Sequence, residues 1–213
     1  MRILLCRHGE TLWNAEGRYQ GQIDIPLSEI GEGQARALGE RLKEVPITRA
    51  VASPLSRAMR TAELALGNRS GMLHTEPGLM EIAHGAWEGK LASDIALEEL
   101  PRLKAWKEAP DTVQMPGGES LQQVLDRAWP AFVTACAGLA AEDILLVVAH
   151  DAVNRVVLAH ILGLPLSRIW GFRQAPATLN LLEGPDPTKL EVVRLNDASH
   201  VAGLFGEARH QAL

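Results

Sequence analysis

Residues 3–11 read ILLCRHGET, an apolar run of strand length that ends in an arginine and a histidine, with a glycine directly after them. A second such run, ILLVVAHD, occupies residues 144–151 and also ends in a histidine. Short continuous apolar runs are typical of strands buried on both faces of a parallel sheet. Because ligands bind outside the carboxyl ends of such strands, we expect His8 and His150 to share one crevice.

Strands and helices are expected to alternate along the rest of the chain. Further strands are predicted at 50–53, 72–75, 180–183 and 190–195. Helical patterns cover 28–45, 56–66, 91–109, 120–141 with a bend or break at Pro130, and 151–162. This order predicts an α/β fold: a three-layer, doubly wound, mostly parallel sheet with helices on both faces. We expect one domain over residues 1–213, with a lid-like helical insertion at about 91–118 and an unassigned C-terminal tail.

The composition is that of an ordinary globular protein. Of 213 residues, 46% are hydrophobic and 22% charged, and the formal net charge is -5. No basic stripe offers a footprint for a nucleic acid. Arg7 interrupts the first apolar run long before the length of a signal-peptide core or a membrane span. With only two cysteines, Cys6 and Cys136, a disulfide framework is not expected, so we predict a cytoplasmic protein without membrane partners.

Four basic side chains are expected to meet at the carboxyl edge of the sheet: Arg7, His8, His150 and Arg57, which begins a helix behind ASPLS. An arginine fork binds phosphate oxygens bidentately and stays charged. A neutral imidazole aimed at phosphorus is a competent nucleophile, and a protonated neighbouring imidazole would stabilise the developing charge. The cluster therefore predicts phosphoryl transfer.

Such a reaction also needs an acid that protonates the leaving oxygen. Glu81, within LMEIAHGAWEG at 79–89, is the candidate, because neighbouring apolar residues would raise the pKa of its carboxyl. No metal and no other cofactor is required, since the arginines and histidines supply the positive charge.

Five blocks along the chain resemble, in order, the signatures of the histidine phosphatase superfamily, the phosphoglycerate-mutase-like proteins. They are CRHGETLWNAEGRYQGQIDIPLSEIGEGQA, SPLSRAMRTAE, EIAHGAWEG, PGGES and VVAHDAVNRVVL, and they extend over roughly residues 2–162. The resemblance implies a phosphohistidine mechanism that water completes. It also implies the site residues: the nucleophile His8, the phosphate-binding Arg7, Arg57, His150 and Asn14, and the proton donor Glu81.

Within this superfamily, the blocks GRYQG, EIAHGAWEG, GGES and LNDASHVAGLFGEARH are most similar to metal-independent phosphoserine phosphatases and α-ribazole phosphatases. This similarity implies a small phosphorylated metabolite as substrate. It places His84 and His200 around the part of the substrate beyond the phosphate. Trp87 lies close enough to Glu81 in the chain to line the same pocket.

Several alternatives stay open. Cofactor-dependent mutases of the superfamily tend to be longer, so hydrolysis is favoured over phosphoglycerate mutase action, and a non-catalytic phospho-ligand-binding module is a third possibility. The chain has Asp151-Ala152 where many members have Gly-Gly, and a carboxylate there would weaken binding of doubly charged substrates. The pair His150-Asp151 also resembles metal ligands of another phosphohydrolase class, although its place after a strand disfavours this. The sequence leaves a monomer and a homodimer both open.

Overall fold

The computed structural model describes residues 1–201, and positions 202–213, which include most of the predicted tail, lie outside the described residues. Its centre is one six-stranded sheet in the order β3-β2-β4-β1-β5-β6. The strands are β1 (Arg2–Arg7), β2 (Arg49–Ala52), β3 (Leu73–Thr75), β4 (Ile144–Ala149), β5 (Leu179–Glu183) and β6 (Glu191–Asp197). β3, β2, β4 and β1 pair in parallel, whereas β5 is antiparallel to both of its neighbours. The predicted mostly parallel sheet is confirmed.

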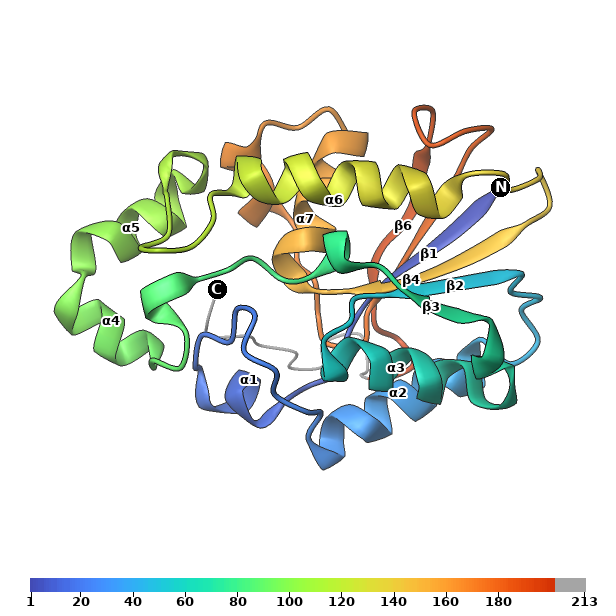
Figure 1. Ribbon diagram of the computed structural model, residues 1–213, viewed down its shortest axis with the longest axis horizontal. Helices are drawn as coiled ribbons and strands as arrows, with labels where there is room; N and C mark the ends of the chain where they lie inside the picture. The colour runs from blue at the N-terminus through green and yellow to red at the C-terminus, as the bar shows by residue number, and fades with distance from the viewer. Residues whose placement is uncertain (202–213) are drawn as a thin grey trace.

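Helices cover both faces of the sheet, which gives the predicted three layers (Figure 1). They are α1 (Leu12–Glu16), α2 (Glu29–Arg41), α3 (Ser56–Leu66), α4 (Ala92–Glu98), α5 (Leu100–Glu108), α6 (Leu121–Cys136) and α7 (Asp151–Ile161). α2 and α3 lie on one face, and α6 and α7 lie on the other. Short 3₁₀ helices occur at Gly67–Met72, Pro77–Leu79, Gly85–Trp87, Pro110–Thr112 and Leu166–Gly171.

The central strands alternate their side chains between two apolar layers. Along β1, Ile3 and Leu5 pack in the cluster beneath α6 and α7, whereas Leu4 and Cys6 pack in the cluster beneath α2 and α3. β4 alternates in the same way, and all six of its residues are buried. Burial on both faces explains why the two sequences read as unbroken apolar runs.

Several helices differ from their predicted bounds, and α2 ends at Arg41, four residues before its predicted end. The segment expected as one helix at 91–109 forms α4 and α5, which break at Glu99, because Pro101 in the first turn of α5 lacks the N–H that would continue the preceding helix. α6 continues through Pro130 and ends at Cys136, two residues before Gly138 with φ of 74°. α1 is not predicted from the sequence.

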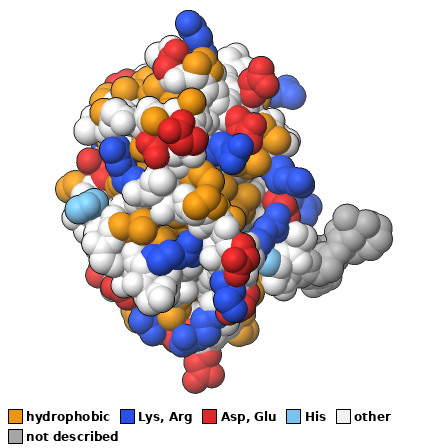
Figure 2. All heavy atoms as spheres, turned by 90° about the vertical axis from the view of Figure 1, so that its right-hand side faces the viewer, with side chains coloured by type: hydrophobic (Ala, Val, Ile, Leu, Met, Phe, Trp, Pro, Cys, Tyr) orange, Lys and Arg blue, Asp and Glu red, His pale blue; other side chains and the backbone are white. Residues whose placement is uncertain are grey.

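α4 and α5 project beyond one end of the sheet (Figure 1), and Trp106 of α5 is fully buried in the main apolar cluster. Figure 2 shows the opposite end of the molecule, where basic and acidic side chains are interspersed around hydrophobic ones. Within residues 1–201, no helix is both long and apolar enough to cross a membrane.

Candidate active site

The two histidines lie side by side because their strands pair in parallel. Arg7 is in register with Ala149, so His8 and His150 both follow directly at the carboxyl edge. The backbone N–H of His8 donates to the Ala149 carbonyl at 3.0 Å, and the two ring centroids are 5.1 Å apart. The two histidines are thus side by side at the carboxyl edge of the sheet.

A backbone contact fixes the tautomer of His8. Its Nδ1 lies 2.6 Å from the carbonyl oxygen of Gly9. A carbonyl oxygen only accepts, so Nδ1 carries the proton and Nε2 is the basic nitrogen of the neutral ring. This is the tautomer that a nucleophilic imidazole requires.

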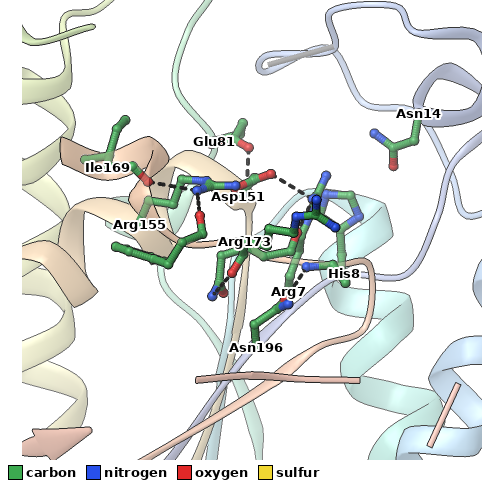
Figure 3. Close-up of polar contacts among 12 residues, drawn as sticks. Arg7, His8, Asn14, Glu81, Asp151, Arg155, Ile169, Arg173 and Asn196 are labelled. Carbon is green, nitrogen blue, oxygen red and sulfur yellow. Dashed lines mark hydrogen bonds and ion pairs between the residues drawn. The ribbon is translucent and has the colours of Figure 1, made fainter. Parts of the chain in front are cut away.

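Arg7 is buried at the end of β1, where its guanidinium is held from one side (Figure 3). Nη1 donates to Oδ2 of Asp151 at 2.8 Å and to the carbonyl of Gln174 at 2.5 Å. Nε is buried without a hydrogen-bond partner among the described residues. The Nε edge of the fork is therefore the part that an anion could occupy.

Arg57 lies in the first turn of α3 and is also buried. Its Nη1 and Nη2 donate to the carbonyls of Ile23 and Gly21 at 3.0 and 2.7 Å, and its buried Nε has no partner within residues 1–201. Burial lowers the pKa of Arg57 to about 10, which leaves it charged at neutral pH. The orphaned Nε atoms of Arg57 and Arg7 are unsatisfied donors of the kind that phosphate oxygens accept.

Gly21, whose carbonyl accepts from Arg57, has a backbone conformation that favours glycine. Its φ is 55°, and a Cβ there would lie 2.0 Å from a carboxylate oxygen of Glu88. Only glycine adopts this conformation at this spacing without displacing its neighbour.

His150 is fully buried, and its Nε2 lies 2.7 Å from the hydroxyl of Ser53, which follows β2. Its Nδ1 is buried without a partner in the described part of the chain. Burial, followed by the charges of Arg57, His8 and Arg7, lowers the pKa of His150 well below its ordinary value. This direction disfavours the protonated second histidine expected from the sequence, whereas a bound phosphate would raise this pKa.

Glu81 follows the 3₁₀ helix Pro77–Leu79, and its side chain is buried. One carboxyl oxygen accepts from the backbone N–H of Ile82 at 2.9 Å, and the other accepts from the backbone N–H of Asp151 at 3.1 Å. Burial and the nearby Asp151 carboxylate raise the pKa of Glu81. These are the surroundings that a general acid needs.

The other residues predicted for the site lie outside this cluster. Asn14 stands apart from His8 in Figure 3, and its side-chain oxygen accepts from the backbone N–H of Thr11 at the start of α1. His200 contacts the Ala177 carbonyl at 2.9 Å and Arg41 at 3.3 Å.

His84 and Trp87 belong to an aromatic group that also contains Tyr19 and Trp106 of α5. The His84 ring makes edge contacts with Tyr19 and Trp106, and burial lowers the pKa of His84 to about 3. Trp87 is fully buried and donates from its indole nitrogen to Glu99 at 3.0 Å.

Three polar residues at the site have no role in the sequence analysis. Ser53 could have been found as a polar residue at the end of a buried strand, as His8 was. Arg155 and Asn154 look like ordinary helix positions, yet α7 buries both, and neither side-chain amide atom of Asn154 has a partner among residues 1–201.

Comparison with known proteins agrees with this geometry. Residues 3–198 match the family model of the histidine phosphatase superfamily (branch 1). The chain is 32% identical over 215 residues to phosphoserine phosphatase 1 of Hydrogenobacter thermophilus, and the match covers 100% of both chains. It is 34% identical to an adenosylcobalamin/alpha-ribazole phosphatase of Salmonella typhimurium, over 81% of this chain and 85% of the relative. A "Probable phosphoglycerate mutase GpmB" of Erwinia tasmaniensis is 36% identical, with 78% and 76% covered.

Solved structures agree with these relatives. YhfR of Bacillus stearothermophilus has a TM-score of 0.86 and 31% identity, over 94% of this chain and 98% of that one. A mycobacterial glucosyl-3-phosphoglycerate phosphatase in complex with VO3 has a TM-score of 0.83 and 28% identity, over 92% and 98%. The chain belongs to the histidine phosphatase superfamily. It is a phosphatase of that type.

Proposed function

We propose that this phosphatase hydrolyses small phosphomonoesters through a phosphohistidine intermediate, without a metal ion. The observation that carries the proposal is the set of buried, unpartnered nitrogens beside His8: Nε of Arg7, Nε of Arg57 and Nδ1 of His150. They come from three separate elements, and each is a donor, or becomes one when protonated, suited to a tetrahedral anion.

In the first step, Nε2 of His8 attacks phosphorus, so the P–N bond forms as the ester P–O bond breaks. The leaving alkoxide takes the proton of the Glu81 carboxyl. In the second step, water attacks the phosphorus of phospho-His8 while the Glu81 carboxylate takes a proton from it. The P–N bond breaks, inorganic phosphate leaves, and Glu81 is again protonated.

The two arginines remain charged throughout and would stabilise the charge that spreads over the phosphoryl oxygens. They supply the role that a divalent cation has in other phosphatases. Turnover of p-nitrophenyl phosphate should therefore persist in excess chelator. Loss of turnover under chelation, with recovery on adding a divalent metal, would contradict the metal-independent route.

Phosphoserine and α-ribazole 5'-phosphate are our candidate substrates, supported by the names of the two phosphatase relatives. His84, Trp87 and His200 remain the candidates for contacts beyond the phosphate, and Asn14 for a further phosphate contact. A panel of phosphoserine, α-ribazole 5'-phosphate, phosphoglycerates and sugar phosphates would rank them by kcat/KM.

Mutase action is the second candidate, because one relative carries a mutase name. Isomerisation of 3-phosphoglycerate that depends on a bisphosphorylated primer, with little release of phosphate, would favour it. Binding of phosphate without turnover of any ester would favour a non-catalytic module. The cytoplasmic location and the oligomeric state remain predictions.

A further inference from the structure

Asp151 lies at the centre of the buried polar network but has no role in the reaction as written above. Both of its carboxylate oxygens are bonded to guanidinium groups: Oδ2 accepts from Arg7 at 2.8 Å, and Oδ1 accepts from Nε of Arg155 (Figure 3). Its side chain is almost fully buried. The sequence alone predicts that this carboxylate would weaken the binding of doubly charged substrates. In the structure, both of its oxygens already accept from a guanidinium group, so neither is presented unpaired to an anion.

Arg155 is itself fixed from several sides. Its Nη1 donates to the carbonyls of Ile169, at 2.8 Å, and Phe172. Its guanidinium also lies over the rings of Trp170 and Phe172, at 5.0 and 5.7 Å from their centroids. A guanidinium held in this way gives Asp151 one orientation.

Asp151 in turn determines how Arg7 is presented. The contacts to Asp151 and to the Gln174 carbonyl both use Nη1, and Nε of Arg7 is left without a partner among the described residues. The backbone N–H of Asp151 also donates to Glu81 at 3.1 Å. One residue thus touches both the proposed phosphate-binding group and the proposed proton donor.

We propose that Asp151, fixed by Arg155, is a positioning residue for this phosphatase: its carboxylate orients Arg7 for bidentate phosphate binding, and its backbone N–H holds the Glu81 carboxyl in place. This inference rests on the proposed function. One carboxylate faces two guanidinium groups, so the three side chains carry a net positive charge. This charge is available to an anionic substrate at Arg7.

The effect on Glu81 has a defined sign. The charged groups that face its carboxyl are Arg7 from β1, Arg57 from α3 and Asp151 from α7, while Arg127 from α6 donates to its backbone carbonyl. Asp151 raises the pKa of Glu81, and the two nearest arginines lower it. Removing the charge of Asp151 should lower this pKa, so the proton donor is lost at a lower pH.

The test compares wild type with Asp151→Asn and with the double variant Asp151→Asn/Arg155→Gln. The double variant removes both charges of the pair, so a folded protein is expected even if the single variant leaves Arg155 without its partner. Glu32→Gln is the matched control, because Glu32 also lies between two arginines, Arg36 and Arg60, but on the surface of α2 and α3.

Three quantities are measured: affinity for inorganic phosphate by calorimetry, kcat/KM for p-nitrophenyl phosphate and phosphoserine, and the pH profile of kcat. Both Asp151 variants should bind phosphate about 10-fold more weakly or worse. The basic limb of the profile should move to lower pH, and phosphoserine turnover should fall further than p-nitrophenyl phosphate turnover, because an alkoxide needs the acid more. The Glu32→Gln profile should match wild type.

Wild-type phosphate affinity together with an unmoved pH profile in both Asp151 variants would overturn the inference. Failure of the proposed function has a different outcome, in which wild type itself turns over neither ester. In that case, the phosphate affinities of the Asp151 variants still test whether Asp151 orients Arg7.

Discussion

Nε2 of His150 lies 2.7 Å from the hydroxyl of Ser53, a contact that joins the ends of β4 and β2, neighbouring strands about 100 residues apart in the chain. Because this contact occupies Nε2, Nδ1 is the ring nitrogen that has no partner among the described residues. In the proposed site, the hydroxyl would therefore determine which ring nitrogen meets the phosphate.

Ser53→Ala should lower kcat/KM by about 10-fold, because the His150 ring loses its orienting partner, and should lower the free energy of unfolding by about 1 kcal/mol. Ser53→Thr retains the hydroxyl and should recover part of the activity. Steady-state kinetics and urea unfolding of the two variants check this. Equal activities in both would contradict the orienting role.

His8→Ala should lower kcat by about 10³-fold or more, because the covalent route is lost. Acid quenching with labelled substrate should trap an acid-labile phosphoenzyme in wild type and none in the variant. A variant of a histidine outside the site, His74→Ala, should behave as wild type. If the His8→Ala variant still retained labelled phosphate after acid quenching, the nucleophile would be a residue other than His8.

The pH dependence of turnover follows from the raised pKa of Glu81. The first step needs the protonated carboxyl, so kcat should fall as pH rises through this pKa, at a higher pH than an ordinary glutamate would give. Glu81→Gln should remove this limb and lower kcat for alkyl phosphates by about 10²-fold to 10⁴-fold. A pH profile with the same limb in Glu81→Gln would assign the acid to another group.

Acid unfolding should depend on His84. Its pKa is about 3 in the folded protein because of burial, so the unfolded chain binds a proton that the folded protein excludes. Below the ordinary histidine pKa of about 6.5, stability from this residue should fall with pH, by about 1.4 kcal/mol per unit until the folded pKa is reached. His84→Phe should flatten this dependence in urea unfolding between those limits. If the free energy of unfolding of His84→Phe had the same slope against pH as wild type, groups other than His84 would determine the pH dependence.

Gly21→Ala should lower both the melting temperature and kcat/KM, because its Cβ would collide with Glu88 and the loop carbonyl that accepts from Arg57 would move. Gly33→Ala is the matched control: it lies in α2, where a Cβ meets nothing within 4 Å. That change should stabilise the protein by about 0.5–1 kcal/mol. Calorimetry and kinetics on both variants separate backbone strain at the site from a general effect of alanine.

The sequence predicts the strands and the histidine pair well because both depend on strong local patterns. Two buried apolar runs imply parallel neighbours, and parallel neighbours place His8 beside His150. The protonation state of His150 could not be predicted in this way, since it depends on burial and on charges from other strands.

Features that depend on single long-range contacts are not visible in the sequence. α1 has only five residues and is stabilised by the Thr11 cap, which is too short a pattern to predict. Arg155 has the spacing of a surface helix residue, and only the folded chain shows that it pairs with Asp151 in the interior.

The position of β1 between β4 and β5 affects the order in which the sheet can form. β1, which leads into the proposed nucleophile His8, precedes both of its neighbours in the chain, and these end only at Ala149 and Glu183. Pairing of this kind across most of the chain forms late. The proposed centre therefore depends on residues as far along the chain as Glu183, because β1 has both of its neighbours only when β5 is in place.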